Sequence, residues 1–342
     1  MLVTFATILL AAFTTAATPT DTTFSVEPGT RLGVNNFGGE IVVTAWNKNS
    51  VRILAQHSER VRVVIAESGP NLEVRAVTRR GIPARVDYAI SVPTWMPLQL
   101  QGVYTDIQVK GVKSDVSAET VKGEVHLDGG EGFVKLSSVE GPLFVGSMKG
   151  RLELNSINET VQVIGAEGEI VVNAVNGDID LQKIVSELVE VSTVNGDVRF
   201  SGELRERGRY NFSTHNGDLI LGMPESPNAT VSVSTFSGDF ESQIPVQIER
   251  SAKPGRRFGF TMGSGAARIN LESFEGTIHL KKAIELIEEG KLRVGRRDLE
   301  RIKILEKLQV QKQIQLQKLE QQLQRREVTS EKQEKHEKDE KR

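Results

Sequence analysis

Four Gly-Asp pairs recur at almost constant spacing, and their carboxylates are the side chains best suited to chemistry. The pairs are Gly177-Asp178, Gly196-Asp197, Gly217-Asp218 and Gly238-Asp239, with glycines 19, 21 and 21 residues apart. A stack of carboxylates could bind calcium, which prefers several converging oxygen ligands. The GGxGxD pattern of calcium-binding nonapeptide repeats is absent from the sequence. We therefore predict that these aspartates bind backbone amides at turns and that the protein holds no metal.

Catalytic signatures are missing as well. The sequence has no GxSxG, HExxH or phosphate-binding glycine loop, and its five histidines are scattered. His126 and His279 occupy equivalent outward positions in GEVHL and GTIHL, and His215 stands at a turn. We predict a protein that is not an enzyme and uses no cofactor. A carbohydrate-active β-helix enzyme is the less favoured alternative.

The elements that would position these residues are short repeated strands. Sequences such as GDIDL, GDVRF and GDLIL follow the glycines and alternate apolar with polar residues, which is typical of β-strands with one buried face. Asn-Gly between such strands also favours antiparallel hairpins. A period held over many copies favours a parallel β-solenoid of about 18–21 residues per coil, because each coil must stack on the previous one. Asn176, Asn195 and Asn216 would then form a hydrogen-bonded ladder at the corners, where glycine supplies positive φ.

Composition excludes several classes of protein. The formal net charge is −2, so no global field favours nucleic acid as a partner. The chain has no cysteine, which excludes disulfides and thiolate metal sites.

The order of segments predicts an exported protein. Residues 1–17 have the apolar run and small-residue end of a signal peptide, and no later segment is apolar enough to span a membrane. Residues 21–101 read as an irregular β capping segment, residues 102–282 as the solenoid, and residues 327–342 as a disordered charged tail.

Residues 283–326 are predicted to be α-helical. Ile302, Leu305, Leu316, Leu319 and Leu323 fall on heptad spacing, whereas Gln309 and Lys312 interrupt the apolar seam. A coiled coil through this helix would give a weak homo-oligomer.

The chain resembles the bacterial "putative adhesin" family, a domain of unknown function with repeated β-strands. The matching stretches are LGVNNFGGEIVVTAW, YAISVPTWMPLQLQGVYTDIQVKGV, the VNGDI, VNGDV and HNGDL coils, and GSGAARINLESFEGTIHLKK. The resemblance covers roughly residues 30–282 and implies a β-solenoid of the cell envelope, with no catalytic residues to carry over.

Together these features predict an exported, non-enzymatic scaffold in the periplasm, cell envelope or cell surface. Its partner would be an envelope or surface component whose identity the sequence does not give. An envelope-stress sensor that acts through the C-terminal helix is the alternative from another class.

Overall fold

The structure is a computed structural model that describes residues 18–78, 85–247, 257–284 and 286. Its elements are β-strands, which confirms the all-β class predicted from alternation. The N-terminal strands are β1 (Thr18–Ser25), β2 (Arg31–Trp46), β3 (Ser50–His57), β4 (Val61–Ser68), β5 (Asn71–Thr78) and β6 (Arg85–Pro93).

The middle of the chain winds into coils that each contribute to two faces. The strands are β7 (Leu98–Lys110), β8 (Val116–Lys122), β9 (Val125–Asp128), β10 (Glu131–Glu140), β11 (Leu143–Gly146), β12 (Lys149–Ser156), β13 (Val161–Ile164), β14 (Glu167–Ala174), β15 (Ile179–Asn195) and β16 (Val198–Asn216). A coil contributes either two strands or, in β7, β15 and β16, one long strand that runs through both faces. Longer strands such as β10, β12 and β14 form a first face, and shorter strands such as β9, β11 and β13 form a second face. A tight corner joins the end of each first-face strand to the second face, and most of these corners contain a glycine, whereas the β12–β13 corner has Asn158 and Glu159.

Successive coils pair in parallel and in register. Val134 lies opposite Leu152, which in turn lies opposite Ile170, so the coils here repeat every 18 residues. These three side chains are fully buried between the two faces, whereas their neighbours along each strand point outward. Alternation therefore places two apolar rows per face in a continuous core.

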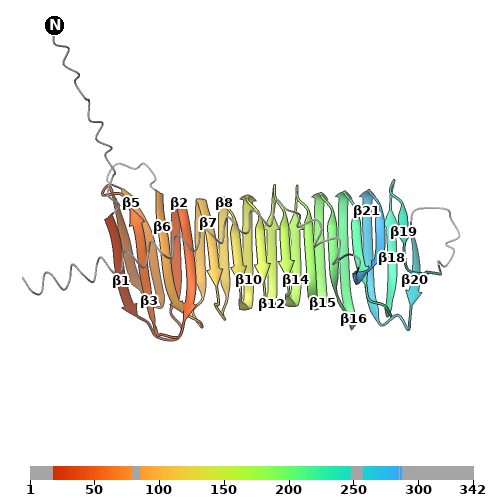
Figure 1. Ribbon diagram of the computed structural model, residues 1–342, viewed down its shortest axis with the longest axis horizontal. Helices are drawn as coiled ribbons and strands as arrows, with labels where there is room; N and C mark the ends of the chain where they lie inside the picture. The colour runs from red at the N-terminus through yellow and green to blue at the C-terminus, as the bar shows by residue number, and fades with distance from the viewer. Residues whose placement is uncertain (1–17, 79–84, 248–256, 285, 287–342) are drawn as a thin grey trace, which may run out of the picture. The chain divides into compact units, whose positions relative to one another are not determined.

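The stack does not follow chain order at its N-terminal end. β2 pairs in parallel with β7 on one side and with β5 and β6 on the other (Figure 1). The first coil thus lies inside the stack, and later strands lie outside it. Parallel stacking therefore extends further toward the N-terminus than the expected start at residue 102, and β7 crosses that boundary.

The C-terminal end is interleaved in the same way. Its strands are β17 (Leu219–Met223), β18 (Ala229–Thr235), β19 (Phe240–Ser242), β20 (Arg257–Met262), β21 (Ala267–Glu275) and β22 (Ile278–Lys282). β21 pairs in parallel with both β16 and β18, and β22 pairs with both β17 and β19 (Figure 1). The last coil is therefore inserted between two coils that precede it in the sequence.

Antiparallel strands flank the parallel stack near both ends. β1 pairs antiparallel with β3, β3 with β6, β4 with β5, and β20 with β18. Strands of reversed direction do not continue the parallel register, and the second face ends in β19, which has only three residues. Such edges offer little template for pairing with another chain.

Some expectations concern residues outside the described part. The signal peptide (residues 1–17), nearly all of the helical segment (residues 283–326) and the charged tail (residues 327–342) fall there. Within the part of the chain that the structure covers, we find no helix with the length and hydropathy needed to cross a membrane.

Candidate functional site

The repeated glycines lie against the backbone of the neighbouring coil. A Cβ atom on Gly196 would overlap the carbonyl oxygen of Gly177, and one on Gly217 would overlap the carbonyl oxygen of Gly196. Gly196 and Gly217 also have φ angles of 157° and 152°, a region that side chains disfavour. Glycine is therefore required here for two reasons, of which the close approach of two backbones is the stronger.

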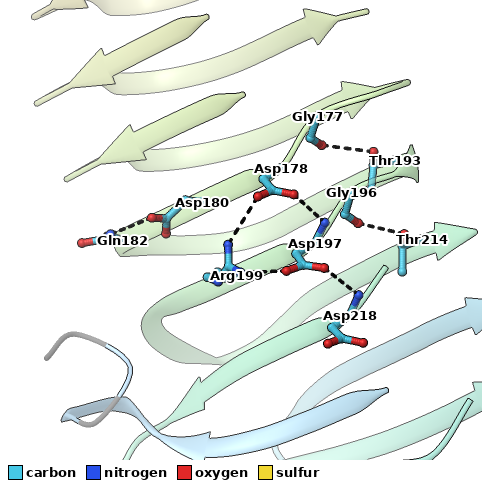
Figure 2. Close-up of polar contacts among 10 residues, drawn as sticks. All are labelled: Gly177, Asp178, Asp180, Gln182, Thr193, Gly196, Asp197, Arg199, Thr214 and Asp218. Carbon is cyan, nitrogen blue, oxygen red and sulfur yellow. Dashed lines mark hydrogen bonds and ion pairs between the residues drawn. The ribbon is translucent and has the colours of Figure 1, made fainter. Parts of the chain in front are cut away.

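Buried hydroxyl groups fill the inside of each corner. Thr193 Oγ1 donates to the Gly177 carbonyl at 3.4 Å, and Thr214 Oγ1 donates to the Gly196 carbonyl at 3.1 Å (Figure 2). Both side chains are almost fully buried, so each hydroxyl satisfies a carbonyl that is shielded from water. This column is not among the features predicted from the sequence. Its signal was a Ser or Thr three residues before the glycine, as at Thr193–Gly196, Thr214–Gly217 and Ser273–Gly276.

Asparagine side chains run along the outside of the same corners. Asn176 Nδ2 donates to Asn158 Oδ1 at 3.1 Å, Asn195 Nδ2 to Asn176 Oδ1 at 2.7 Å, and Asn216 Nδ2 to Asn195 Oδ1 at 2.7 Å. The repeat in the sequence predicts such a ladder for Asn176, Asn195 and Asn216, and the structure adds Asn158 to it. The ladder links four successive coils through side chains that remain exposed.

The aspartates bind the backbone of the following coil. Asp178 Oδ1 accepts from the Asp197 amide at 2.9 Å, and Asp197 Oδ1 accepts from the Asp218 amide at 3.0 Å (Figure 2). Asp218 Oδ1 in turn accepts from the Thr277 amide at 2.7 Å. One oxygen of each carboxylate is therefore engaged by a backbone donor of the next coil.

A single arginine faces two of these carboxylates. Arg199 donates to Asp197 Oδ2 at 2.7 Å, and its guanidinium lies 3.8 Å from Asp178 Oδ2 (Figure 2). The Arg199 side chain is only 14% exposed, which limits screening by water. The arginine reduces the repulsion that stacked carboxylates would otherwise suffer.

The fourth Gly-Asp pair does not continue this column directly. Gly238 packs against Gly276, and the Asp239 carbonyl accepts from the Ile278 amide at 2.9 Å. The coil of Thr277 therefore separates Asp239 from Asp218, although the repeat in the sequence placed them in adjacent coils. Interleaving of the last coil causes this difference.

No group of three or more His, Asp or Glu side chains suited to a metal ion occurs in the described ranges. The histidines stay apart: His126 packs near Phe144, and His215 stacks on Phe274 with ring centroids 4.5 Å apart. Burial and the nearby Lys110 lower the pKa of His126, which favours its neutral form. His279 lies 3.2 Å from Glu241 and 3.7 Å from Asp218. The described arrangement holds coils together but brings no acid, base and nucleophile to one point.

Comparison with known proteins gives one family match. The model of a family described as Toastrack DUF4097 matches residues 30–281. No curated protein matches the sequence.

Several solved structures are similar to the chain. A "putative adhesin" from Parabacteroides distasonis is 8% identical, with a TM-score of 0.44, over 78% of this chain and 98% of that one. A "putative adhesin" from Bacteroides fragilis is 12% identical, with a TM-score of 0.42 and the same coverage. A "putative cell adhesion protein" from Clostridium sporogenes is 14% identical, with a TM-score of 0.22, over 78% of this chain and all of that one.

Proposed function

Because this chain belongs to the Toastrack DUF4097 family, we propose that it is an exported, non-enzymatic scaffold whose outer faces contact the cell envelope or surface. The family match agrees with the resemblance drawn from the sequence, which covered nearly the same residues. Export rests on the apolar run and small-residue end of residues 1–17.

The bonding of the corner carboxylates carries the non-enzymatic part of the proposal. Asp178, Asp197 and Asp218 each give one oxygen to a backbone amide of the next coil, so these side chains stabilise the stack. The outward positions form regular rows with one side chain per coil. A rigid row of this kind suits an extended contact with a large partner better than a reaction at one point.

Fractionation of cells that produce the full chain tests export. We expect the protein in the envelope or extracellular fraction, with its first residue near Thr18 by mass spectrometry. A variant with Leu9→Arg and Leu10→Arg, which interrupts the apolar run, should stay in the cytoplasm. Recovery of the unaltered chain in the cytoplasm with residues 1–17 intact would overturn export.

Binding to isolated envelopes tests the scaffold role. We expect the purified full chain to co-sediment with envelopes from its own cells in a saturable way. A turnover assay with envelope polysaccharide should yield no new reducing ends. Release of such ends by the full chain would contradict the non-enzymatic reading, and unsaturable or absent binding would contradict the scaffold.

A further inference from the structure

An exposed apolar row runs along the outside of the glycine corners. Each coil contributes one side chain to it, and the aliphatic part consists of Val121, Val139, Ile157, Val175 and Val194. Four of these five are 42–47% exposed. Backbone registers place them opposite one another in successive coils. We call this row, together with its two ends, the corner seam.

Aromatic side chains occupy both ends of the corner seam. His215, Phe274 and Phe236 lie at one end, where Phe274 stacks on each of the other two with ring centroids 4.5 Å apart. Phe37 lies at the other end, opposite Val103 in the register and 5.5 Å from the Tyr104 ring. Phe236 is 56% exposed and Phe37 is 40% exposed, so apolar side chains reach both ends of the seam, and His215 is its one polar member.

Uncharged polar side chains border the middle of the corner seam. The asparagine ladder from Asn158 to Asn216 lies on one side. Residues such as Asn155 and Asn173, joined by a 3.3 Å hydrogen bond, lie on the other. Nothing in these two borders would repel a second apolar surface through charge.

We propose that the corner seam is a dimer interface in which two copies of this chain pack seam against seam. Ten positions at a strand spacing of about 4.8 Å make a row on the order of 43 Å long. Seven of the ten side chains are 39–56% exposed. The row presents on the order of 700 Å², close to the roughly 800 Å² per partner of stable interfaces.

The spacing of the side chains along the corner seam indicates that a second copy of this chain binds there. Another solenoid of this chain repeats its side chains at the same spacing, so the two rows stay in register from end to end. An α-helix repeats every 5.4 Å along its axis and would drift by about 0.6 Å per coil. Over the five aliphatic coils that drift amounts to several ångströms.

Shape selects antiparallel stacks. Charge favours neither direction, because parallel packing would set Glu275 of each copy against Glu272 of the other but would also set Lys122 against Glu119. Antiparallel packing sets Glu275 opposite Tyr104 and Ile157 opposite Val175. It also brings Phe274 and His215 of one copy over a shallow groove of about 450 Å³ beside Val121 in the other. Bulky rings at one end thus meet a hollow at the other.

Sedimentation velocity of the full chain over a wide concentration range tests the proposal. We expect a reversible dimer, and Val175→Asp should weaken it about tenfold or more because a charge would be buried without a partner. Ile164→Asp is the matched control, since Ile164 is a 39% exposed aliphatic residue outside the seam. Val175→Asn provides a second, uncharged variant, and thermal melting should show that all three variants fold.

Disulfide trapping tests the orientation, because the chain has no cysteine of its own. A mixture of Val139→Cys and Val194→Cys chains should yield the mixed disulfide, whereas Val139→Cys alone should not cross-link. Self-linking of Val139→Cys would overturn the antiparallel arrangement. A full chain that stays monomeric, or a dimer that Val175→Asp leaves intact, would overturn the seam as a self-interface. A monomer that still binds envelopes would overturn the self-interface and leave the scaffold proposal standing.

Discussion

At the scale of single residues, the corner depends on small groups fitted between two backbones. Gly196 leaves no room for a side chain, and Thr193 and Thr214 supply hydroxyls to the carbonyls that the glycines bring close. Steric fit and hydrogen bonding therefore act on the same few atoms. Replacement of either group should disturb the other.

Substitution of Gly196 tests the steric part of this account. Gly196→Val should lower the free energy of unfolding by at least about 3 kcal/mol, because its Cβ would overlap the Gly177 carbonyl. Gly69→Ala is the matched control: φ is +58° there, but nothing lies within 4 Å of the added atom. The control should lower the free energy of unfolding by only about 1 kcal/mol. Chemical denaturation measures both losses of stability. Equal losses would mean that glycine is required at the corner for its backbone conformation and not for the close approach of the neighbouring coil.

Much of the corner could be predicted from the sequence, and part of it could not. Alternation around Val191 and Val198 predicted strands because a buried face needs every second residue to be apolar. The recurring glycines indicated tight corners. Thr193 and Val194 were overlooked because a Thr or a Val inside a strand is ordinary by composition. Only the stacking of coils turns them into a hydroxyl column and an exposed apolar row.

At the scale of elements, ladders of side chains bond one coil to the next. The carboxylates of Asp178 and Asp197 would repel each other if they faced only water and one another. Backbone amides engage one oxygen of each, and Arg199 lies beside the other. The second-face parts of β15 and β16 are thus joined by charge as well as by their backbone register.

Removal of the arginine tests this electrostatic contribution. Arg199→Met should destabilise the fold by about 1–2 kcal/mol at low salt, and the loss should shrink as salt screens the carboxylates. Arg205→Met is the control, because Arg205 pairs with Glu203 at 3.2 Å with both side chains largely exposed. Urea unfolding at two salt concentrations measures both effects. A loss that does not depend on salt would assign Arg199 a packing role instead.

The arrangement of elements at the two ends could not be predicted from the repeat. The coils around Gly238 and Gly276 have similar sequences, and either could pair with the coil of Gly217. The repeat in the sequence indicates that coils stack, but it does not indicate which coil lies next to which. The interleaving of β2 and of β21 with β22 therefore became visible only in the structure.

At the scale of the whole molecule, we expect the fold to be stable without a bound metal ion. Asp178, Asp197 and Asp218 already accept hydrogen bonds from backbone amides, and Arg199 lies beside the first two. Dialysis against EDTA should move the melting temperature by no more than about 2 °C, because a ligand that is not bound contributes no stability. Calorimetry before and after calcium is restored measures this. A large drop that calcium reverses would reassign the carboxylates as ligands.

The inserted C-terminal coil also has a consequence for biosynthesis. Residues 229–242 leave the ribosome before residues 267–282, yet their final neighbour is the later segment and not β16 with β17. Until the later segment emerges, the edge of β16 and β17 that β21 and β22 finally occupy is open to them. Correct folding therefore requires that the earlier coil leave this edge to the last one. A nascent chain can complete its native stack only after residue 282 has been translated.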